Sequence, residues 1–373
     1  MSGVYQAVVQ QVLNVMIIIM ASFLILFTLL LIVLHFITNA AHKRMQQIRQ
    51  QILRLISPDA QIEYMKGQIY EVINGDTEKI TLRKIRGIRS QRGIQVLEMI
   101  SHTVEGLQRT LLLQVVQEDW FSSYLKKVVT GRNQSAALLA GKLIAQLGIT
   151  NYGDDIENNL RRWPGSPSVQ EICFLVFFMQ GAEERLVRIL SDPEFDLVLS
   201  FRTLQELFSY FPGNRSELYR SLLTCAQDQY VKRACIRGIG MEGYTDMCEM
   251  IVPYLSSQNQ NIQIETIRTF GRLKYTPVFA QIVTMTQNDK WEVRCAAVDT
   301  CAQLDPQHCY DPILKCVCDK EWWVRFHAAE VLVTLPCREK LLDDVQASND
   351  RYAYEMIQYM IERETILKGG IVA

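Results

Sequence analysis

A run of 26 residues without a formal charge, from Val12 to Ile37, constrains this chain more than any other feature. A helix of that length, at about 1.5 Å per residue, exceeds the roughly 30 Å thickness of a bilayer's hydrocarbon core. The run therefore predicts a transmembrane helix. The alternative is a cleaved signal peptide, which has a basic amino-terminal region and an apolar core of only about 7 to 15 residues. The sequence has neither of these features.

The charges around the run predict its orientation. No Lys, Arg, Asp or Glu precedes Lys43, whereas Lys43 to Arg92 contains 11 basic and 5 acidic residues. Because basic residues flank membrane spans on the cytoplasmic side, we expect a single-pass cell-membrane protein with its amino terminus outside and its carboxyl-terminal domain in the cytoplasm. The scattered cysteines agree with a reducing compartment. The chain beyond Arg92 is mildly acidic, so we expect no nucleic-acid partner.

The helix is expected to continue past the span. Apolar residues recur at helical spacing at Met45, Ile48, Ile52 and Leu55, until Ser57 and Pro58 stop the pattern. Residues 1–40 then form a short external tail and the transmembrane helix, and residues 41–92 form a basic juxtamembrane helical region. We expect its basic residues to contact anionic lipid headgroups or a partner protein, the alternative being a solvated flank. These residues are Lys43, Arg44, Arg49, Arg54, Arg83, Lys84, Arg86, Arg89 and Arg92.

The carboxyl-terminal half contains an internal repeat. Four segments align without gaps on residues that follow one another at intervals of 31, namely Val231, Ile262, Val293 and Val324. Small or modest side chains follow at Cys235, Thr266, Ala297 and Ala328, and apolar ones at Ile239, Phe270, Cys301 and Leu332. This spacing defines one helical face. A shorter helix precedes each copy, with an expected cap at Ser216, Thr245, Thr276 and Asp311.

We find no strand pattern, so the predicted fold class is all-α, with one amino-terminal transmembrane helix followed by an α-solenoid of helix pairs. The segments 291–297 and 323–329 resemble the second helix of HEAT repeats, because a Val-Arg pair is followed by small residues. The resemblance implies a solenoid over residues 93–345, which residues 346–373 complete as a capping helix and tail.

The resemblance to HEAT repeats also assigns two arginines a structural role. In that family, the Arg of the second helix hydrogen-bonds to acidic turn residues of neighbouring repeats. Arg294 and Arg325 match this position, with Asp289 and Asp319 as implied partners. Lys232 and Gln263 stand at the same position in the earlier copies, so these two copies depart from the arginine of the family.

The layout of the chain suggests a function. An amino-terminal span, a basic linker and acidic repeats are similar to bacterial membrane-anchored HEAT-repeat proteins that accompany a family 2 membrane glycosyltransferase in polysaccharide assembly. The similarity implies a non-enzymatic scaffold that binds a membrane protein partner. Trp291 and Trp322 occupy the same repeat position and are flanked by Lys290 and Lys320, so we expect these four residues to form a partner-binding patch. The alternative is that the two tryptophans fill gaps between helix pairs.

Motifs for chemistry are weak. Gly238, Gly240 and Gly243 match the dinucleotide fingerprint in letters, but they end a predicted helix instead of following a strand. Cys316 and Cys318 face different ways on a predicted helix, and the sequence contains no pair of CxxC motifs. The adjacent His-Glu pairs of HEAT-like iron hydroxylases are also missing. We therefore expect no catalytic, cofactor or metal site. The alternative function is a HEAT-like lyase, or another enzyme, acting on a membrane-proximal substrate.

Overall fold

The computed structural model describes residues 2–56, 62–65, 68–73, 76–79, 85, 87–335 and 338–369. The chain folds into two compact units, Met1–Asn159 and Leu160–Ala373. The predicted all-α class is confirmed. The boundary between the units lies inside the segment 93–345 that was predicted to be one solenoid. The turn-forming residues Pro164 and Gly165, with a φ of +68° at Gly165, follow it directly.

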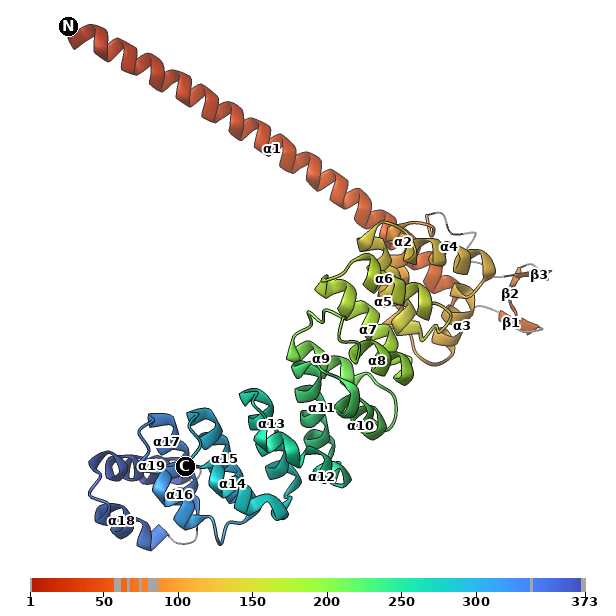
Figure 1. Cartoon of the computed structure of the whole chain (residues 1–373). Helices are drawn as coiled ribbons and strands as arrows, with labels where there is room; N and C mark the ends of the chain where they lie inside the picture. Colours follow the sequence, from red (N-terminus) through yellow and green to blue (C-terminus); the bar gives the residue numbers. More distant parts are fainter. Residues whose placement is uncertain are drawn as a thin grey trace. The chain divides into compact units, whose positions relative to one another are not determined.

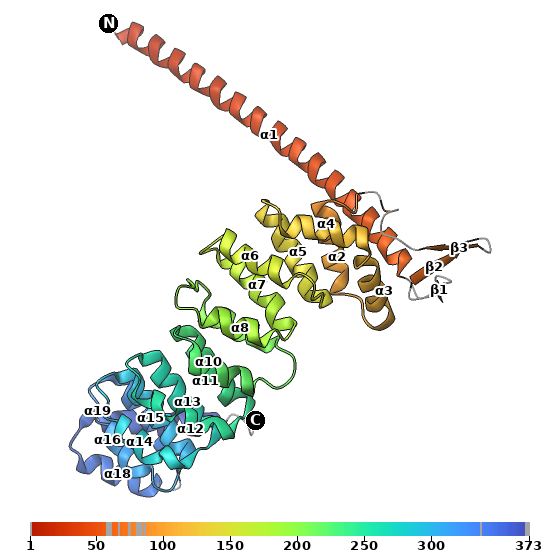
Figure 2. The same ribbon diagram turned by 45° about the vertical axis from the view of Figure 1, so that its right-hand side comes forward.

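The first unit begins with helix α1 (Ser2–Leu55), which is 54 residues long and uninterrupted in both views (Figures 1 and 2). The large apolar side chains between Phe23 and Ile37 are 47% to 69% exposed. The segment Ser22–Arg54 is long and apolar enough to cross a membrane, a property that amino-terminal signal sequences share. The predicted continuation of the helix is confirmed: Ile48 is 6% exposed and Ile52 is 0% exposed, and α1 packs on α2 (Gln91–Ser101).

The region 41–92 differs from the helical prediction, because it also contains a three-stranded antiparallel sheet of order β1-β2-β3. The strands are β1 (Ile62–Met65), β2 (Gln68–Ile73) and β3 (Asp76–Lys79). Ile73 pairs with Asp76, so only Asn74 and Gly75 separate β2 from β3 in the sequence. Asn-Gly is the strongest short hairpin signal, and β2 is rich in β-branched and aromatic residues. None of these three strands alternates strictly between apolar and polar residues, so the two-residue period is missing from the sequence.

The rest of the first unit is helical and ends within α6. Its remaining helices are α3 (Gly106–Val116), α4 (Asp119–Val129), α5 (Gln134–Leu147) and α6 (Gly153–Arg162). Helix α5 packs on both α2 and α4.

The second unit is a succession of short helices. Its first part contains α7 (Pro167–Met179), α8 (Glu183–Leu190), α9 (Phe201–Ser209), α10 (Ser216–Cys225), α11 (Gln229–Glu242), the 3-10 helix η2 (Thr245–Met247), α12 (Cys248–Ile251) and the 3-10 helix η3 (Val252–Ser256). Its second part contains α13 (Gln260–Leu273), the 3-10 helix η4 (Thr276–Val278), α14 (Phe279–Met285), α15 (Trp291–Leu304), α16 (Tyr310–Cys316), α17 (Trp322–Thr334), α18 (Arg338–Ala347) and α19 (Arg351–Gly369).

The repeat of the sequence is a repeat of the structure. Helices α11, α13, α15 and α17 begin at residues 31 apart. We call these four, with α9 and α19, the second helices; each packs on the next along the chain, while α10, α14 and α16 pack on α11, α15 and α17. The aligned residues are buried as predicted. Their exposures are at most 2% at Val231, Ile262, Val293 and Val324, and 0% at Cys235, Thr266, Ala297 and Ala328. The second unit is therefore an α-solenoid.

The expected helix caps are corrected by the structure. The shorter helices that precede the four aligned second helices are α10, η2, η4 and α16, and each begins within one residue of Ser216, Thr245, Thr276 or Asp311. The residues at their N-cap positions make no side-chain capping hydrogen bond. The side-chain caps are instead on second helices. Asp228 accepts from the backbone N–H groups of residues 230 and 231, and Asn259 from those of residues 261 and 262. These side chains fix the start of α11 and α13.

Arg294 links neighbouring repeats. Its Nε and Nη2 atoms each donate to the carboxylate of Asp319 at 2.7 Å, while Nη1 donates to the backbone carbonyls of Asn288 and Asp289. Asp319 is the partner that the family resemblance implied, whereas Asp289 contributes its carbonyl and not its carboxylate. The hydrogen bonds to Asp319 raise the pKa of Arg294 against the opposing effect of burial. At the equivalent position, Gln263 donates to the carbonyl of Leu255 at 2.7 Å.

The glycines that resemble a dinucleotide fingerprint have packing roles. A Cβ atom on Gly238 would collide with the ring and hydroxyl of Tyr219 in α10. A Cβ atom on Gly240 would lie 2.9 Å from Oγ1 of Thr269 in α13. Gly243 is the C-cap of α11 with a φ of +80°. Gly238 and Gly240 thus let α11 approach α10 and α13, and Gly243 lets the helix end.

We predict that Gly238→Ala lowers the stability of the protein. In an exposed helix, replacing Gly by Ala gains about 1 kcal/mol. Here the added methyl group overpacks against Tyr219, which is 1% exposed, and overpacking costs about 1–3 kcal/mol. After the propensity gain, a net cost of up to about 2 kcal/mol is expected. The thermal midpoint followed by circular dichroism measures the effect. The same substitution in a Tyr219→Leu background should cost less, and an equal cost in both backgrounds would contradict the proposed collision.

Candidate functional site

A groove of about 1030 Å³ lies between α1 and the start of α2. Arg44 contributes to it from α1 and Arg92 from α2, so the structure brings together two of the basic residues predicted to contact lipid or a partner. The rest of the lining is mainly amide and hydroxyl side chains, together with Ile48 and Gly87. The polar lining residues are Gln47, Gln51, Ser90, Gln91 and Gln95. Two guanidinium groups among amides suit a ligand that carries a phosphate group.

The turn before α2 shapes this groove. Gly87 has a φ of +87°, which favours glycine, and the Cβ atom of another residue would lie 3.6 Å from Cδ1 of Ile48. Ser90 donates to the carbonyl of Gly87 at 2.6 Å and accepts from the backbone N–H of Gly93 at 3.1 Å. Ser90 is therefore the N-cap of α2. These bonds place Arg92 on the first turn of the helix, facing α1 across the groove.

The other basic residues of the prediction have different positions. Lys43, Arg49 and Arg54 are exposed on α1 and do not line the groove. The guanidinium of Arg89 lies 4.5 Å from the ring centroid of Trp120 in α4. Arg89 also lowers the pKa of Tyr124, whose burial has the larger, opposite effect. Arg89 is thus engaged inside the first unit. Arg83, Lys84 and Arg86 lie outside the residues that the structure describes.

The structure groups Trp322 with other aromatic residues than the predicted partner Trp291. Trp322 is 46% exposed and its ring is 4.8 Å from that of Trp323, which is 51% exposed, and 5.0 Å from that of Phe326. We call Trp322, Trp323 and Phe326 the aromatic patch. Trp291 is 36% exposed and lies on α15, one repeat away. The ring contacts that join the patch, in the part of the chain that the structure describes, do not include it.

The aromatic patch has a charged border. The guanidinium of Arg363 in α19 lies 5.6 Å from the ring centroid of Phe326 and donates to Glu330 at 3.0 Å. Lys290 and Lys320 are exposed residues just before α15 and α17. The carbonyl of Lys320 accepts from Arg325 at 3.3 Å, so its backbone has a structural role. The sequence could have indicated Phe326 as well, because it follows Trp322 by four residues and Trp323 by three, which is the spacing of neighbours on one helical face.

A titratable pair lies next to the patch. Nδ1 of His327 in α17 lies 3.0 Å from Oδ1 of Asp299 in α15. This hydrogen bond raises the pKa of His327, while burial and Arg268 act in the opposite direction and Glu330 supports the rise. The pair therefore joins two second helices most strongly when the imidazole is protonated.

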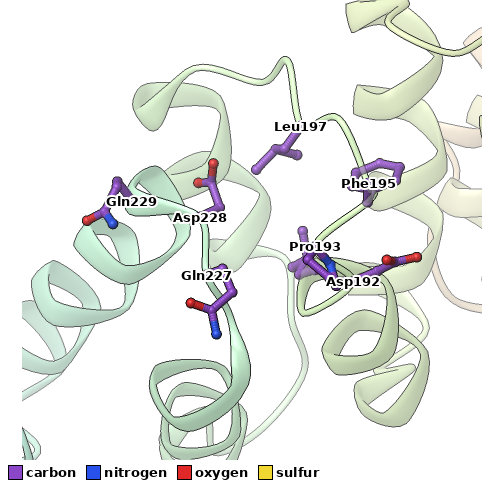
Figure 3. Close-up of a pocket in the computed structure, with 8 residues that line it drawn as sticks. Asp192, Pro193, Phe195, Leu197, Gln227, Asp228 and Gln229 are labelled. Carbon is purple, nitrogen blue, oxygen red and sulfur yellow. The ribbon is translucent and has the colours of Figure 1, made fainter.

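A smaller pocket of about 300 Å³ lies in the second unit between the loop after α8 and the start of α11. Figure 3 shows Asp192, Pro193 and Phe195 on the loop and Asp228 at the start of the helix. Gln170 holds the same loop, because its side chain donates to the carbonyl of residue 196 and accepts from the N–H of residue 198. Since Asp228 is already used as the cap of α11, this pocket contains no cluster of free reactive groups. In the described part of the chain, no three His, Cys, Asp or Glu residues are grouped so that they could hold a metal ion.

We predict that the contribution of His327 to stability depends on pH. Its pKa is raised in the folded protein, so the stabilisation is complete below the unfolded value of about 6.5 and is lost as the pH rises through the folded value. The difference in thermal midpoint between the wild type and His327→Gln should be larger at pH 5.5 than at pH 8.5. Asp299→Asn should remove this pH dependence, and a difference that is equal at both pH values would contradict the assignment.

Comparisons with protein-family models and with curated proteins give no match to this chain. Among solved structures, the chain is similar to the crystal structure of an engineered protein, at 14% sequence identity and a TM-score of 0.34, over 72% of this chain and 78% of that one.

Proposed function

We propose that this protein is a membrane-tethered scaffold, whose solenoid binds a partner protein on the cytoplasmic side. The observation that carries the proposal is α1, which presents exposed large apolar side chains from Phe23 to Ile37 and then continues without a break into a stripe buried in the first unit. Such a helix places a folded domain directly at the membrane surface. The absence of charge before Lys43 supports the cytoplasmic orientation.

The groove at the base of α1 fits this arrangement. Arg44 follows Ile37 by seven residues, which is roughly 10 Å along a helix. Because helical side chains tilt toward the amino terminus, a guanidinium at this position reaches back to the phosphate layer of a bilayer. Arg92 lines the groove from the opposite side. We therefore assign the groove to the headgroup of an anionic phospholipid.

The aromatic patch is the proposed contact with the partner. Two exposed tryptophans supported by Phe326 present a rigid apolar area, and such residues contribute strongly to protein interfaces. Tethering adds to this contact, because it replaces a bimolecular encounter with a high effective concentration at the membrane. The layout of the chain makes a family 2 membrane glycosyltransferase the first partner to test.

The groove is tested by titrating the full chain, in a zwitterionic detergent, with short-chain phosphatidylglycerol. Each basic residue near an anionic headgroup contributes about 1 kcal/mol, so Arg44→Gln with Arg92→Gln should weaken binding roughly 30-fold. The matched control is Lys43→Gln with Arg49→Gln, which removes the same charge from exposed positions outside the groove. Equal weakening by both pairs would mean that charge alone, and not the groove, attracts the lipid.

The aromatic patch is tested by co-purification from membranes in mild detergent, with mass spectrometry to quantify the proteins retained. Replacing Trp322 and Trp323 by Ala should weaken partner association by about 2 kcal/mol or more, while membrane location and folding stay unchanged. The matched control is Tyr230→Ala, because Tyr230 is 51% exposed and occupies the repeat position of Trp323 in α11. Full retention of the partner by the double variant would place the interface elsewhere.

A further inference from the structure

The exposed sides of α11 and α13 contain a surplus of arginine. Arg233 and Arg237 are on α11, and Arg268 and Arg272 are on α13. Arg237 and Arg268 occupy the same position in neighbouring repeats, because they are 31 residues apart. The side chains of Arg233, Arg237 and Arg272 are 23%, 35% and 29% exposed, and Arg268 is exposed. All four therefore remain within reach of a ligand in solution.

A single buried carboxylate holds three of these arginines. Glu265 is 0% exposed, and its Oε1 atom accepts a hydrogen bond of 3.1 Å from Nη1 of Arg272. Its Oε2 atom lies 3.7 Å from Nε of Arg233 and 3.8 Å from Nη1 of Arg237. Both Oε2 and the Nε of Arg233 are buried without a hydrogen-bond partner. One carboxylate thus orients three guanidinium groups but neutralises only one positive charge.

An aromatic ring fixes the same cluster from α9. The guanidinium of Arg233 lies 3.8 Å from the ring centroid of Phe201, and that of Arg237 lies 5.9 Å from it. Stacking on the ring and attraction to Glu265 restrict both side chains before any ligand arrives. A restricted guanidinium loses less conformational entropy when it binds a carboxylate, so the cluster is preorganised for an anion.

A recess of about 370 Å³ lies directly beside the cluster, and Arg237 lines it. Phe208 of α9 and Met241 of α11 supply apolar walls of the recess. Two carboxylates also line it: Glu242, which pairs with Arg215 at 2.7 Å, and Glu206 of α9. Met241 is 65% exposed. A volume of this size suits one large apolar side chain. The surface therefore combines anchored positive charge with a neighbouring place for an apolar residue.

The sign of the charge changes along the repeats. The residues equivalent to Arg237 and Arg268 in the next two repeats are Asp299 of α15 and Glu330 of α17. A long polyanion running along the second helices would be attracted by the first two repeats. In the next two it would meet carboxylates, of which Asp299 pairs with His327 and Glu330 with Arg363. The pattern therefore favours a short acidic segment that covers α11 and α13 only.

We propose that the surface formed by α9, α11 and α13 binds a short acidic peptide segment of a partner protein. Carboxylates of the segment contact Arg237, Arg268 and Arg272, and an apolar side chain enters the recess next to Met241. The proposal rests on the scaffold function only for the identity of the protein that carries the segment. The site itself is independent of the tether and of the aromatic patch.

The test is a titration of the full chain in zwitterionic detergent with a fluorescein-labelled peptide, Glu-Glu-Leu-Glu-Glu-Leu, followed by fluorescence anisotropy at low salt. Arg237→Gln and Arg268→Gln should each weaken binding about tenfold, because each removes a charge-assisted hydrogen bond. Arg220→Gln on α10 is the matched control and should leave binding unchanged, since Arg220 lies outside the cluster and pairs with Glu217 and Asp246.

Glu265→Gln distinguishes a binding site from a purely structural ion-pair cluster. The substitution keeps an acceptor for Arg272 and removes the negative charge that competes with the peptide, while the ring of Phe201 still restricts Arg233 and Arg237. Peptide binding should therefore become tighter. If this variant does not fold, the exposed Arg237 and Arg268 variants still decide the question. Unchanged affinity in both arginine variants, equal binding of a Lys-Lys-Leu-Lys-Lys-Leu peptide, or displacement of the acidic peptide by an equal concentration of inorganic phosphate would overturn the proposal. Failure of the aromatic patch in co-purification would leave this titration unaffected.

Discussion

Close packing between successive second helices is the interaction on which the solenoid unit depends. Each of α11, α13, α15 and α17 buries one row of apolar residues and one row of small or modest residues, and these smaller side chains let the helix axes approach. Gly238 and Gly240 extend the same principle to both neighbours of α11. Because the packed sides are used for stacking, the remaining side of each second helix is left for charged and aromatic residues, and this is where the proposed binding surfaces lie.

Much of this packing was predictable, because burial recurs with the 31-residue period of the repeat. The register on Val293 and Ala297 follows from that period alone. What the sequence left undetermined has two physical origins. Strands β2 and β3 do not alternate strictly between apolar and polar residues. Helix starts have several competing acceptors, so Asp228 caps α11 while Thr245 caps nothing. Local chemistry of this kind is decided by tertiary contacts.

The candidate sites, like the fold, were only partly predictable from the sequence. Basic residues near Arg44 and a tryptophan at position 322 are visible in the sequence, but their neighbours depend on how helices meet. Arg92 reaches the groove because a turn at Gly87 brings α2 against α1. The arginine cluster was not predicted at all, since Phe201, Arg233 and Glu265 come from three different helices, each 32 residues from the next. The recurrence of arginine at Arg237 and Arg268, 31 residues apart, is a signal that the sequence had available.

The unbroken course of α1 has a geometric consequence. A continuous α-helix rotates by about 100° per residue, so the apolar segment and the buried stripe at Ile48 and Ile52 have a fixed angular phase. Any twist of the apolar segment about its axis is transmitted to the first unit, and inserting one residue between them would turn the groove toward a different side. The helix thus fixes the rotation of the first unit about the helix axis as well as its distance from the apolar segment.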